Sequence, residues 1–318
     1  MIDFSNVNWN EVRELLKQLS SLNNEEIIKF FSVLNIPKNV ELNIGSTKEV
    51  MDLLDSQEWD EAVNPNLLVQ SEEDKRIRAE DIVFLFMGDK QDGITFLNVG
   101  CEEGHIADLV ANRNAKLSVG YDIKIENEWQ KNNFNRPNLF YSNEFSEIQA
   151  KGPYDKILMY DILDHVENPI EILKQVKSVL SPNGEINIRC HPWCSRHGGH
   201  LYKIKNKAYL HLILTDEEIK MINEGLLMIS NGGKLIYVNK IIHPRNTYAR
   251  WFNEIGLKID SDYMVEDTVP SFFYKNPIIS SRIKKNWQTS PNPHLSSGEI
   301  FPHFQLGISF IDYKLSHK

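Results

Sequence analysis

A glycine-containing turn and one later carboxylate are the first features of this sequence that could do chemistry. Residues 96–109 read FLNVGCEEGHIADL, in which an apolar run leads into GCEEG at 100–104 and then into a helix-like pattern. Glycines between a strand and a helix let the backbone approach a ligand closely, and the helix start offers free N–H groups. Asp122 ends the next apolar run, where a carboxylate can accept hydrogen bonds from two ribose hydroxyls. The turn and Asp122 therefore predict a site for a ligand that contains a nucleoside.

A second group of reactive side chains lies in the segment RCHPWCSRHGGH, residues 189–200. Arginine can bind a carboxylate or phosphate through two parallel hydrogen bonds, and histidine can accept a proton near neutral pH. We therefore expect Arg196 and His197 to bind or orient an anionic acceptor. If the reaction needs a base, His191 or His197 is the candidate. These three residues are the predicted catalytic residues.

Basic side chains continue around this segment although the chain as a whole is acidic. No acidic residue occurs from Arg189 until Asp216, and a second acid-free stretch covers residues 268–298. The cations of the two stretches are Arg189, Arg196, Lys203, Lys205, Lys207, Lys275, Arg282, Lys284 and Lys285. Fixed cations at a site favour an anionic substrate, whereas two solvated surface loops are the simpler alternative. Both interpretations stay open on the sequence alone.

The same segment also contains a possible set of zinc ligands. The candidates are Cys190, His191, Cys194, His197 and His200. Structural zinc sites usually need four ligands on spaced turns, and this cluster directly follows a strand and contains Pro192 and Trp193. We therefore favour histidines that serve substrate binding or proton transfer, and we predict no bound metal.

The elements that position these residues change character along the chain. Residues 1–88 are predicted to form a helical N-terminal region, whereas short apolar runs alternate with helical patterns from about residue 89 onward. Strands that alternate with helices predict an α/β fold, a doubly wound and mostly parallel Rossmann-like sheet. We expect one domain over 89–318 with substrate-side insertions at about 193–245 and 268–300. Such sheets bind ligands at the carboxyl ends of their strands.

The order strand, Gly-Cys-x-x-Gly, helix, strand, Asp resembles the class I S-adenosylmethionine-dependent methyltransferases. YDKILMYDILDHVENP at 154–169 resembles that family's fourth-strand segment, and LSPNGEINI at 180–188 resembles its turn into the fifth strand. The first motif departs from the family pattern at two places, where Asn98 replaces the usual acid and Glu102 replaces the middle glycine. The resemblance covers residues 93–192 well and extends more loosely to two final strands.

This resemblance implies S-adenosylmethionine as the cofactor and assigns roles by position. Gly100, Cys101 and Gly104 would line the methionine part, Asp122 would hold the ribose, and Ile123 would lie against the adenine. Asn143 or Glu144 would sit near the adenine amino group, and Asp161 would face the cofactor and the substrate. The implied function is methyl transfer, and with the fixed cations described above the expected acceptor is a small molecule or a terminal group that is anionic.

Two other interpretations come from different classes of protein. Asp161, Asp164, His165 and His200 are similar to the metal ligands of small-RNA 3′-terminal 2′-O-methyltransferases, although both acids are one methylene shorter. A metal-dependent RNA methyltransferase is therefore the alternative enzyme. Asn98 and Glu102 favour a non-catalytic adaptor that retains the fold.

Composition limits the partners and the location. The 318 residues include 41% apolar and 25% charged residues, with a net charge of −9, which argues against general binding of nucleic acid. No apolar run approaches the length of about 20 residues that a membrane span needs. The start MIDFSNVNWNEV lacks the pattern of a secretory signal, and three cysteines cannot form a disulfide framework. We therefore expect a cytoplasmic protein without a membrane partner, and we make no prediction of its oligomeric state.

Overall fold

The computed structural model describes residues 43–65, 70–124, 136–163, 165–166, 168–191, 195–197, 201–223, 245–266, 273, 275–289 and 308–318. All elements described below belong to one compact unit, Asn43–Lys318.

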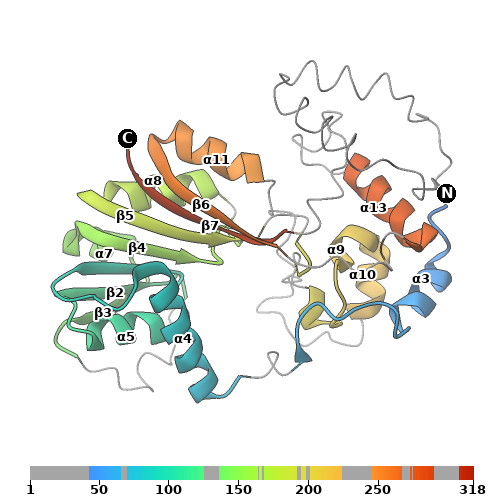
Figure 1. The fold of residues 1–318 in the computed structure, drawn as a ribbon, viewed down its shortest axis with the longest axis horizontal. Coiled ribbons are helices and arrows are strands. Elements are labelled where there is room, and N and C mark those ends of the chain that lie inside the picture. The colour runs from blue at the N-terminus through green and yellow to red at the C-terminus, as the bar shows by residue number, and fades with distance from the viewer. Residues whose placement is uncertain are drawn as a thin grey trace, which may run out of the picture. The chain divides into compact units, whose positions relative to one another are not determined.

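A seven-stranded sheet forms the centre of this unit (Figure 1). Its strands are β1 (Thr95–Val99), β2 (Leu117–Tyr121), β3 (Leu139–Ser142), β4 (Tyr154–Tyr160), β5 (Leu180–Cys190), β6 (Leu257–Glu266) and β7 (Ile308–His317). The spatial order is β3-β2-β1-β4-β5-β7-β6. The first five strands pair in parallel, and β7 runs antiparallel to both β5 and β6. The predicted α/β class with a mostly parallel sheet is confirmed, and the strand order reverses between β1 and β4, where such sheets bind ligands.

Helices flank the sheet and form a separate cluster. They are α3 (Thr47–Leu54), α4 (Glu72–Met87), α5 (His105–Asn112), α7 (Phe145–Lys151), α8 (Pro169–Ser178), η2 (Leu201–Lys203), α9 (Leu210–Ile213), α10 (Asp216–Asn223), α11 (Arg245–Glu254) and α13 (Pro277–Thr289). Local sequence explains several starts. Ser46 and Glu49 form a capping box before α3, and the Asn168 side chain accepts a hydrogen bond at the start of α8, where Pro169 occupies the first turn.

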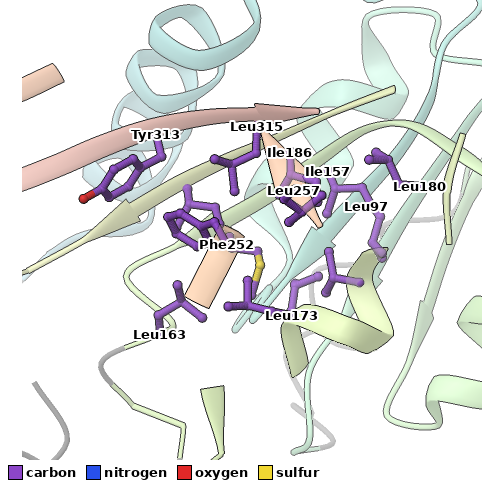
Figure 2. Close-up of a cluster of buried hydrophobic side chains, with 14 of the residues drawn as sticks. Leu97, Ile157, Leu163, Leu173, Leu180, Ile186, Phe252, Leu257, Tyr313 and Leu315 are labelled. Carbon is purple, nitrogen blue, oxygen red and sulfur yellow. The ribbon is translucent and has the colours of Figure 1, made fainter. Parts of the chain in front are cut away.

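One face of the sheet packs against α8 and α11. Leu97, Ile157 and Ile186 of the strands meet Leu173 of α8 and Phe252 of α11, and all five side chains are fully buried (Figure 2). Burial of large apolar side chains contributes roughly 1.5–3 kcal/mol each, so this layer holds the parallel strands in register.

The opposite face packs against α4 and α5. Phe96 and Leu158 of the strands meet Ile82 and Val83 of α4 and Val110 of α5. Because α4 lies on α5 and on the sheet, its position relative to the turn at 100–104 is set by this core. The helix is thus part of the frame of the predicted cofactor site.

A second apolar core joins segments far apart in the sequence. Val50 of α3 and Trp59 pack with Leu212 of α9, Phe273 and Ile279 of α13. The Trp59 indole N–H donates to the carbonyl of Ala208 at 2.8 Å. Helix α3 from the predicted N-terminal region therefore packs with parts of both predicted insertions, while the domain boundaries themselves stay a prediction.

No helix within the described part of the chain has both the length and the hydropathy that crossing a membrane requires.

Candidate cofactor and acceptor site

The turn after β1 is shaped by two backbone conformations that favour glycine. Gly100 has φ +73°, and its N–H and that of Cys101 donate to the carbonyl of Tyr121 at 2.7 and 3.1 Å. A Cβ on Gly100 would lie 1.9 Å from Cδ1 of Ile162, so no larger residue fits. Gly104 has φ +92° and precedes α5, whose first turn has no side-chain cap. The N–H groups at the start of α5 are therefore not occupied by a capping side chain, as a ligand-binding turn requires.

Tyr141 supports the same turn from the neighbouring strand. Its hydroxyl donates to the carbonyl of Gly104 at 2.7 Å, and its ring lies where a Cβ on Gly104 or Gly120 would clash. The two glycines therefore make room for Tyr141 as well as for a ligand. The sequence analysis did not identify Tyr141, because only the pairing of β2 with β3 brings it beneath the turn.

Asp122 lies at the tip of β2 and is oriented by the turn. One carboxylate oxygen accepts the N–H of Glu102 at 3.1 Å, and the other accepts the N–H of Lys124, also at 3.1 Å. Each oxygen keeps a second lone pair for a ribose hydroxyl. Ile123 is 78% exposed beside it, which leaves its side chain free to cover a flat ring.

The two departures from the family motif do not close this site. Glu102 adopts φ +45° and its side chain is exposed, so the residue makes the turn without filling it. Asn98 is 2% exposed, and its Oδ1 has no hydrogen-bond partner among the described residues. A buried acceptor without a partner is costly, and a ligand N–H is one way to satisfy it. Neither residue supports the adaptor interpretation.

The predicted adenine-side residues follow β3. Asn143 is half-buried, and Glu144 is exposed and immediately precedes α7. The N–H of Glu144 donates to the Ser142 hydroxyl at 2.9 Å, which fixes the backbone at this strand end. Both lie at the carboxyl edge of the parallel strands with Gly100 and Asp122, because β1, β2 and β3 are neighbours in the sheet.

Asp161, which is partly buried, and His191, which is buried, lie together at the ends of β4 and β5. His191 Nε2 lies 3.3 Å from Asp161 Oδ1, and His191 Nδ1 lies 2.9 Å from the carbonyl of Ser309. Burial alone would raise the pKa of the Asp161 carboxyl, but His191, together with Arg189, holds that pKa below its usual value. Both ring nitrogens of His191 thus lie near oxygen atoms of the chain, which fixes the orientation of the ring beside Asp161.

His197 packs against this pair as a neutral ring. The centroids of His191 and His197 are 4.7 Å apart, with an angle of 75° between the ring planes. Burial and the adjacent His191 lower the pKa of His197 to about 3. Its Nδ1 is buried without a hydrogen-bond partner in the part of the chain that the structure describes. A neutral ring with an unused nitrogen can hydrogen-bond to a ligand but accepts a proton poorly.

Three cations of the predicted acceptor segment contact residues 55–61. Arg196 lies 3.8 Å from a carboxylate oxygen of Asp60, and Lys205 lies 2.7 Å from a carboxylate oxygen in the same range. Lys207 donates to two main-chain carbonyls there. These contacts attach Arg196, Lys205 and Lys207 to the loop before α4, so these three cations are engaged within the chain.

Arg189 and Arg282 also form ion pairs within the chain. Arg189 forms two hydrogen bonds of 2.6 Å to Asp312 and lies over the ring of Phe310 at 3.6 Å. Arg282 forms a buried ion pair with Glu218. Arg189 and Arg282, one from each acid-free stretch, thus form ion pairs with residues far away in the sequence.

The predicted metal ligands are only partly described. Cys194, His200 and Asp164 lie outside the described residues. Cys190 is buried on β5, with its Sγ 3.8 Å from the carbonyl of Ile311. The absence of a bound metal therefore stays a prediction, and the metal-dependent and zinc interpretations stay alternatives to it.

One group of metal-ligating side chains does occur among the residues with described positions. It comprises Glu72, Glu103 and His105. Lys75 Nζ lies 2.8 Å from Glu72 and 2.7 Å from Glu103, and these carboxylates raise the pKa of Lys75 to about 12. The Lys75 ammonium supplies the positive charge between these carboxylates. The ion pair of Lys75 with Glu103 thereby joins α4 to the turn after β1.

Comparison with known proteins identifies the family to which the chain belongs. Residues 71–261, more than half of the chain, match the family described as a methyltransferase domain. The chain belongs to this methyltransferase family. It is an S-adenosylmethionine-dependent methyltransferase, as the motif resemblance implied, and the turn, Asp122 and the orphaned oxygen of Asn98 fit that cofactor.

Individual relatives of this methyltransferase are distant. It is 29% identical over 100 residues to a tRNA U34 carboxymethyltransferase of Campylobacter curvus. The aligned residues make up 30% of this chain and 34% of the relative. The match thus spans about a third of that relative's length. A Listeria monocytogenes protein assigned as an S-adenosylmethionine-dependent methyltransferase is similar at a TM-score of 0.47 and 16% identity, over 76% of this chain and 98% of the other. Magnesium protoporphyrin IX methyltransferase of Synechocystis PCC 6803 is similar at a TM-score of 0.40 and 13% identity, over 87% and 96%.

Proposed function

We propose that this methyltransferase acts on an acceptor whose nucleophilic atom is already anionic when it binds, with a carboxylate as the group that fits best. The observation that carries the proposal is the surroundings of the two histidines beside the ends of β4 and β5. Both ring nitrogens of His191 are already placed against oxygen atoms of the chain, and burial lowers the pKa of His197 to about 3. Neither ring is suited to remove a proton from a hydroxyl or an ammonium group.

An anionic acceptor removes the need for a base. S-adenosylmethionine supplies the methyl group on a positively charged sulfur when it is bound. The methyl group would pass from that sulfur to a carboxylate oxygen, with the electron pair of the C–S bond left on sulfur and no proton to remove. The opposite charges of sulfonium and carboxylate would cancel, which a site shielded from water favours.

The chain's own residues then act by binding and orientation. We assign Gly100, Cys101 and Gly104 to the methionine part of the cofactor, Asp122 to its ribose and Ile123 to its adenine ring. Asn143 or Glu144 is assigned to the adenine amino group, and Asp161 to the methionine end. These roles are proposals supported by the turn geometry and by the common strand edge.

We assign roles to the three predicted catalytic residues in the same way. His191 positions Asp161, and His197 offers its unused nitrogen to the acceptor. Arg196 orients the segment through its contacts with Asp60 and the carbonyl of Glu61. Positioning of two reactants in a shielded site supplies a large share of the rate in such transfers.

A labelling experiment tests the acceptor class. The protein is incubated with methyl-labelled S-adenosylmethionine and a cell extract separated into small-molecule and RNA fractions. Mild alkali hydrolyses carboxyl methyl esters to volatile methanol and leaves N-methyl and ether products intact. We expect alkali-labile label in the small-molecule fraction. Alkali-stable label in that fraction would contradict the proposal.

An RNA acceptor is the second candidate. It is favoured by the match to the tRNA-modifying relative, and the net charge of −9 argues against it. Label in the RNA fraction would support it, and loss of that label with a chelator would support the metal-dependent form with Asp161, Asp164, His165 and His200 as ligands.

A further inference from the structure

We propose that a cavity beside the acceptor segment binds a polyhydroxylated, sugar-like part of the acceptor, with Glu61 as one of its hydroxyl-binding residues. The inference deepens the proposed function and rests on it in one respect: the group that fills the cavity belongs to the molecule whose carboxylate receives the methyl group. It therefore concerns which carboxylates the protein accepts.

The cavity is formed by two segments that lie far apart in the sequence. Its volume is about 710 Å³. Residues 57 and 59–65 supply one wall, and Arg196 and Lys207 supply the other. Binding pockets for small molecules measure roughly 300–1,000 Å³, so a sugar ring fits this space.

Hydrogen bonds hold the first wall of the cavity against a neighbouring loop. The Trp59 indole N–H donates to the carbonyl of Ala208 at 2.8 Å, and the N–H of Ala208 donates to the carbonyl of Asp60 at 2.9 Å. The Asn206 side chain accepts the N–H of Val63 at 3.1 Å and donates to the Val63 carbonyl at 2.8 Å. A wall that is fixed before the ligand arrives loses little conformational entropy on binding.

The side chains that line the cavity carry charges of both signs. Asp60 and Glu61 bring two carboxylates, and Arg196 and Lys207 bring two cations, so the formal charges cancel. The amide side chains of the first wall add both donors and acceptors. A lining without net charge does not favour an ion, whereas mixed donors and acceptors match hydroxyl groups, which both donate and accept. The exposed carboxylate of Glu61 has the lone pairs to accept from two neighbouring hydroxyls of a sugar.

Arg196 connects the cavity to the reaction site. It lines the cavity, and its carbonyl accepts the N–H of Tyr209 at 2.8 Å. The next residue, His197, packs against His191 at the end of β5, with ring centroids 4.7 Å apart. Because consecutive Cα atoms are only about 3.8 Å apart, a molecule of the size of a sugar acid can reach both His197 and the cavity.

Saturation-transfer NMR on the full chain tests this binding. The probes are D-glucuronate, D-galacturonate, D-glucose and D-galactose, with cyclohexanecarboxylate as a ring acid that lacks hydroxyls. We expect at least one of the sugars to bind and cyclohexanecarboxylate not to bind. Glu61→Ala should weaken that sugar about threefold or more, within the range for one hydrogen bond, and Glu61→Gln should fall between alanine and the wild type. Glu58→Ala is the matched control, since Glu58 is exposed in the same loop but outside the cavity lining, and it should leave the affinity unchanged.

Three results would overturn the inference: no sugar of the panel binds, cyclohexanecarboxylate binds as well as the sugars, or Glu61→Ala and Glu58→Ala have equal effects. Thermal unfolding of Glu61→Ala at the wild-type temperature excludes loss of the fold as the cause of weaker binding. The labelling experiment separates this failure from failure of the proposed function. Methyl ester formation by a protein that binds no sugar refutes only the cavity assignment. Sugar binding together with alkali-stable label refutes the carboxylate acceptor and supports the cavity as a sugar site.

Discussion

Replacement of Asp122 by alanine is the most direct perturbation of the proposed cofactor site. The side chain accepts two backbone N–H bonds, from Glu102 and Lys124, each at 3.1 Å. Alanine removes these acceptors together with those assigned to the ribose hydroxyls. The backbone donors can turn to water because Glu102 and Lys124 are exposed, so the cost in stability is about 0.5–1.5 kcal/mol.

The loss in cofactor binding should be larger. A hydrogen bond to a charged group contributes about 1.5–3 kcal/mol, and two ribose hydroxyls would give roughly twice that in a fully buried site. Asp122 is only partly buried, so we expect a loss of about 1.5–3 kcal/mol in total, or about 10–150-fold in affinity. Asp122→Asn, which keeps one acceptor oxygen, should fall between the wild type and alanine.

Calorimetry with S-adenosylhomocysteine measures this loss, and thermal unfolding of each variant measures stability. Asp52→Ala is the matched control, since Asp52 is an exposed carboxylate on α3. It should leave the affinity unchanged. If Asp122→Ala binds S-adenosylhomocysteine as tightly as the wild type, the ribose role of Asp122 is refuted.

Two further variants test the frame of the site. Gly100→Ala should lower the free energy of unfolding by about 2–5 kcal/mol, because alanine costs about 1–2 kcal/mol in the left-handed region and its Cβ would displace Ile162; an unchanged denaturation midpoint would contradict this. Glu218→Gln should cost about 3 kcal/mol by leaving Arg282 without its buried counter-charge. Burial raises the pKa of Glu218, but the ion pair outweighs this and lowers that pKa below 4.5, so the pair stabilises the fold above pH 4.5 and its contribution is lost as the pH falls further. The free energy of unfolding, measured at several pH values between 7 and 3, should therefore vary less with pH in Glu218→Gln than in the wild type.

Much of the fold and of the cofactor turn could be predicted from the sequence because the signals are local. The alternation of apolar strands and helical patterns predicts the parallel sheet, and GCEEG with Asp122 predicts the ligand turn at the end of β1. A strand, a tight turn and the next strand tip lie within about 30 residues of one another, the length of one βαβ unit. Right-handed crossover then places them at the same edge of the sheet.

Tertiary structure decided which partners the basic residues have. Lys205 and its partner Asp55 are 150 residues apart, and Arg189 and Asp312 are 123 residues apart. A stretch without acids therefore predicts a basic patch from the sequence, although Arg189, Lys205 and Arg282 each pair with a carboxylate of another segment. No local pattern carries that information, because which segments meet depends on how α3, α9 and α13 share one apolar core.

The surroundings of the two histidines were decided in the same way. The sequence identified His191 and His197 as residues capable of proton transfer, since imidazole titrates near neutral pH. His191 lies against the Ser309 carbonyl, which is 118 residues away and which β7 places beside β5, and burial lowers the pKa of His197 to about 3. The sequence by itself determined the family, the sheet and the position of the cofactor turn, all of which follow from short-range pattern and spacing. Only the tertiary structure decided which charges are free and which ring can take a proton, because both depend on burial and on partners that folding brings together.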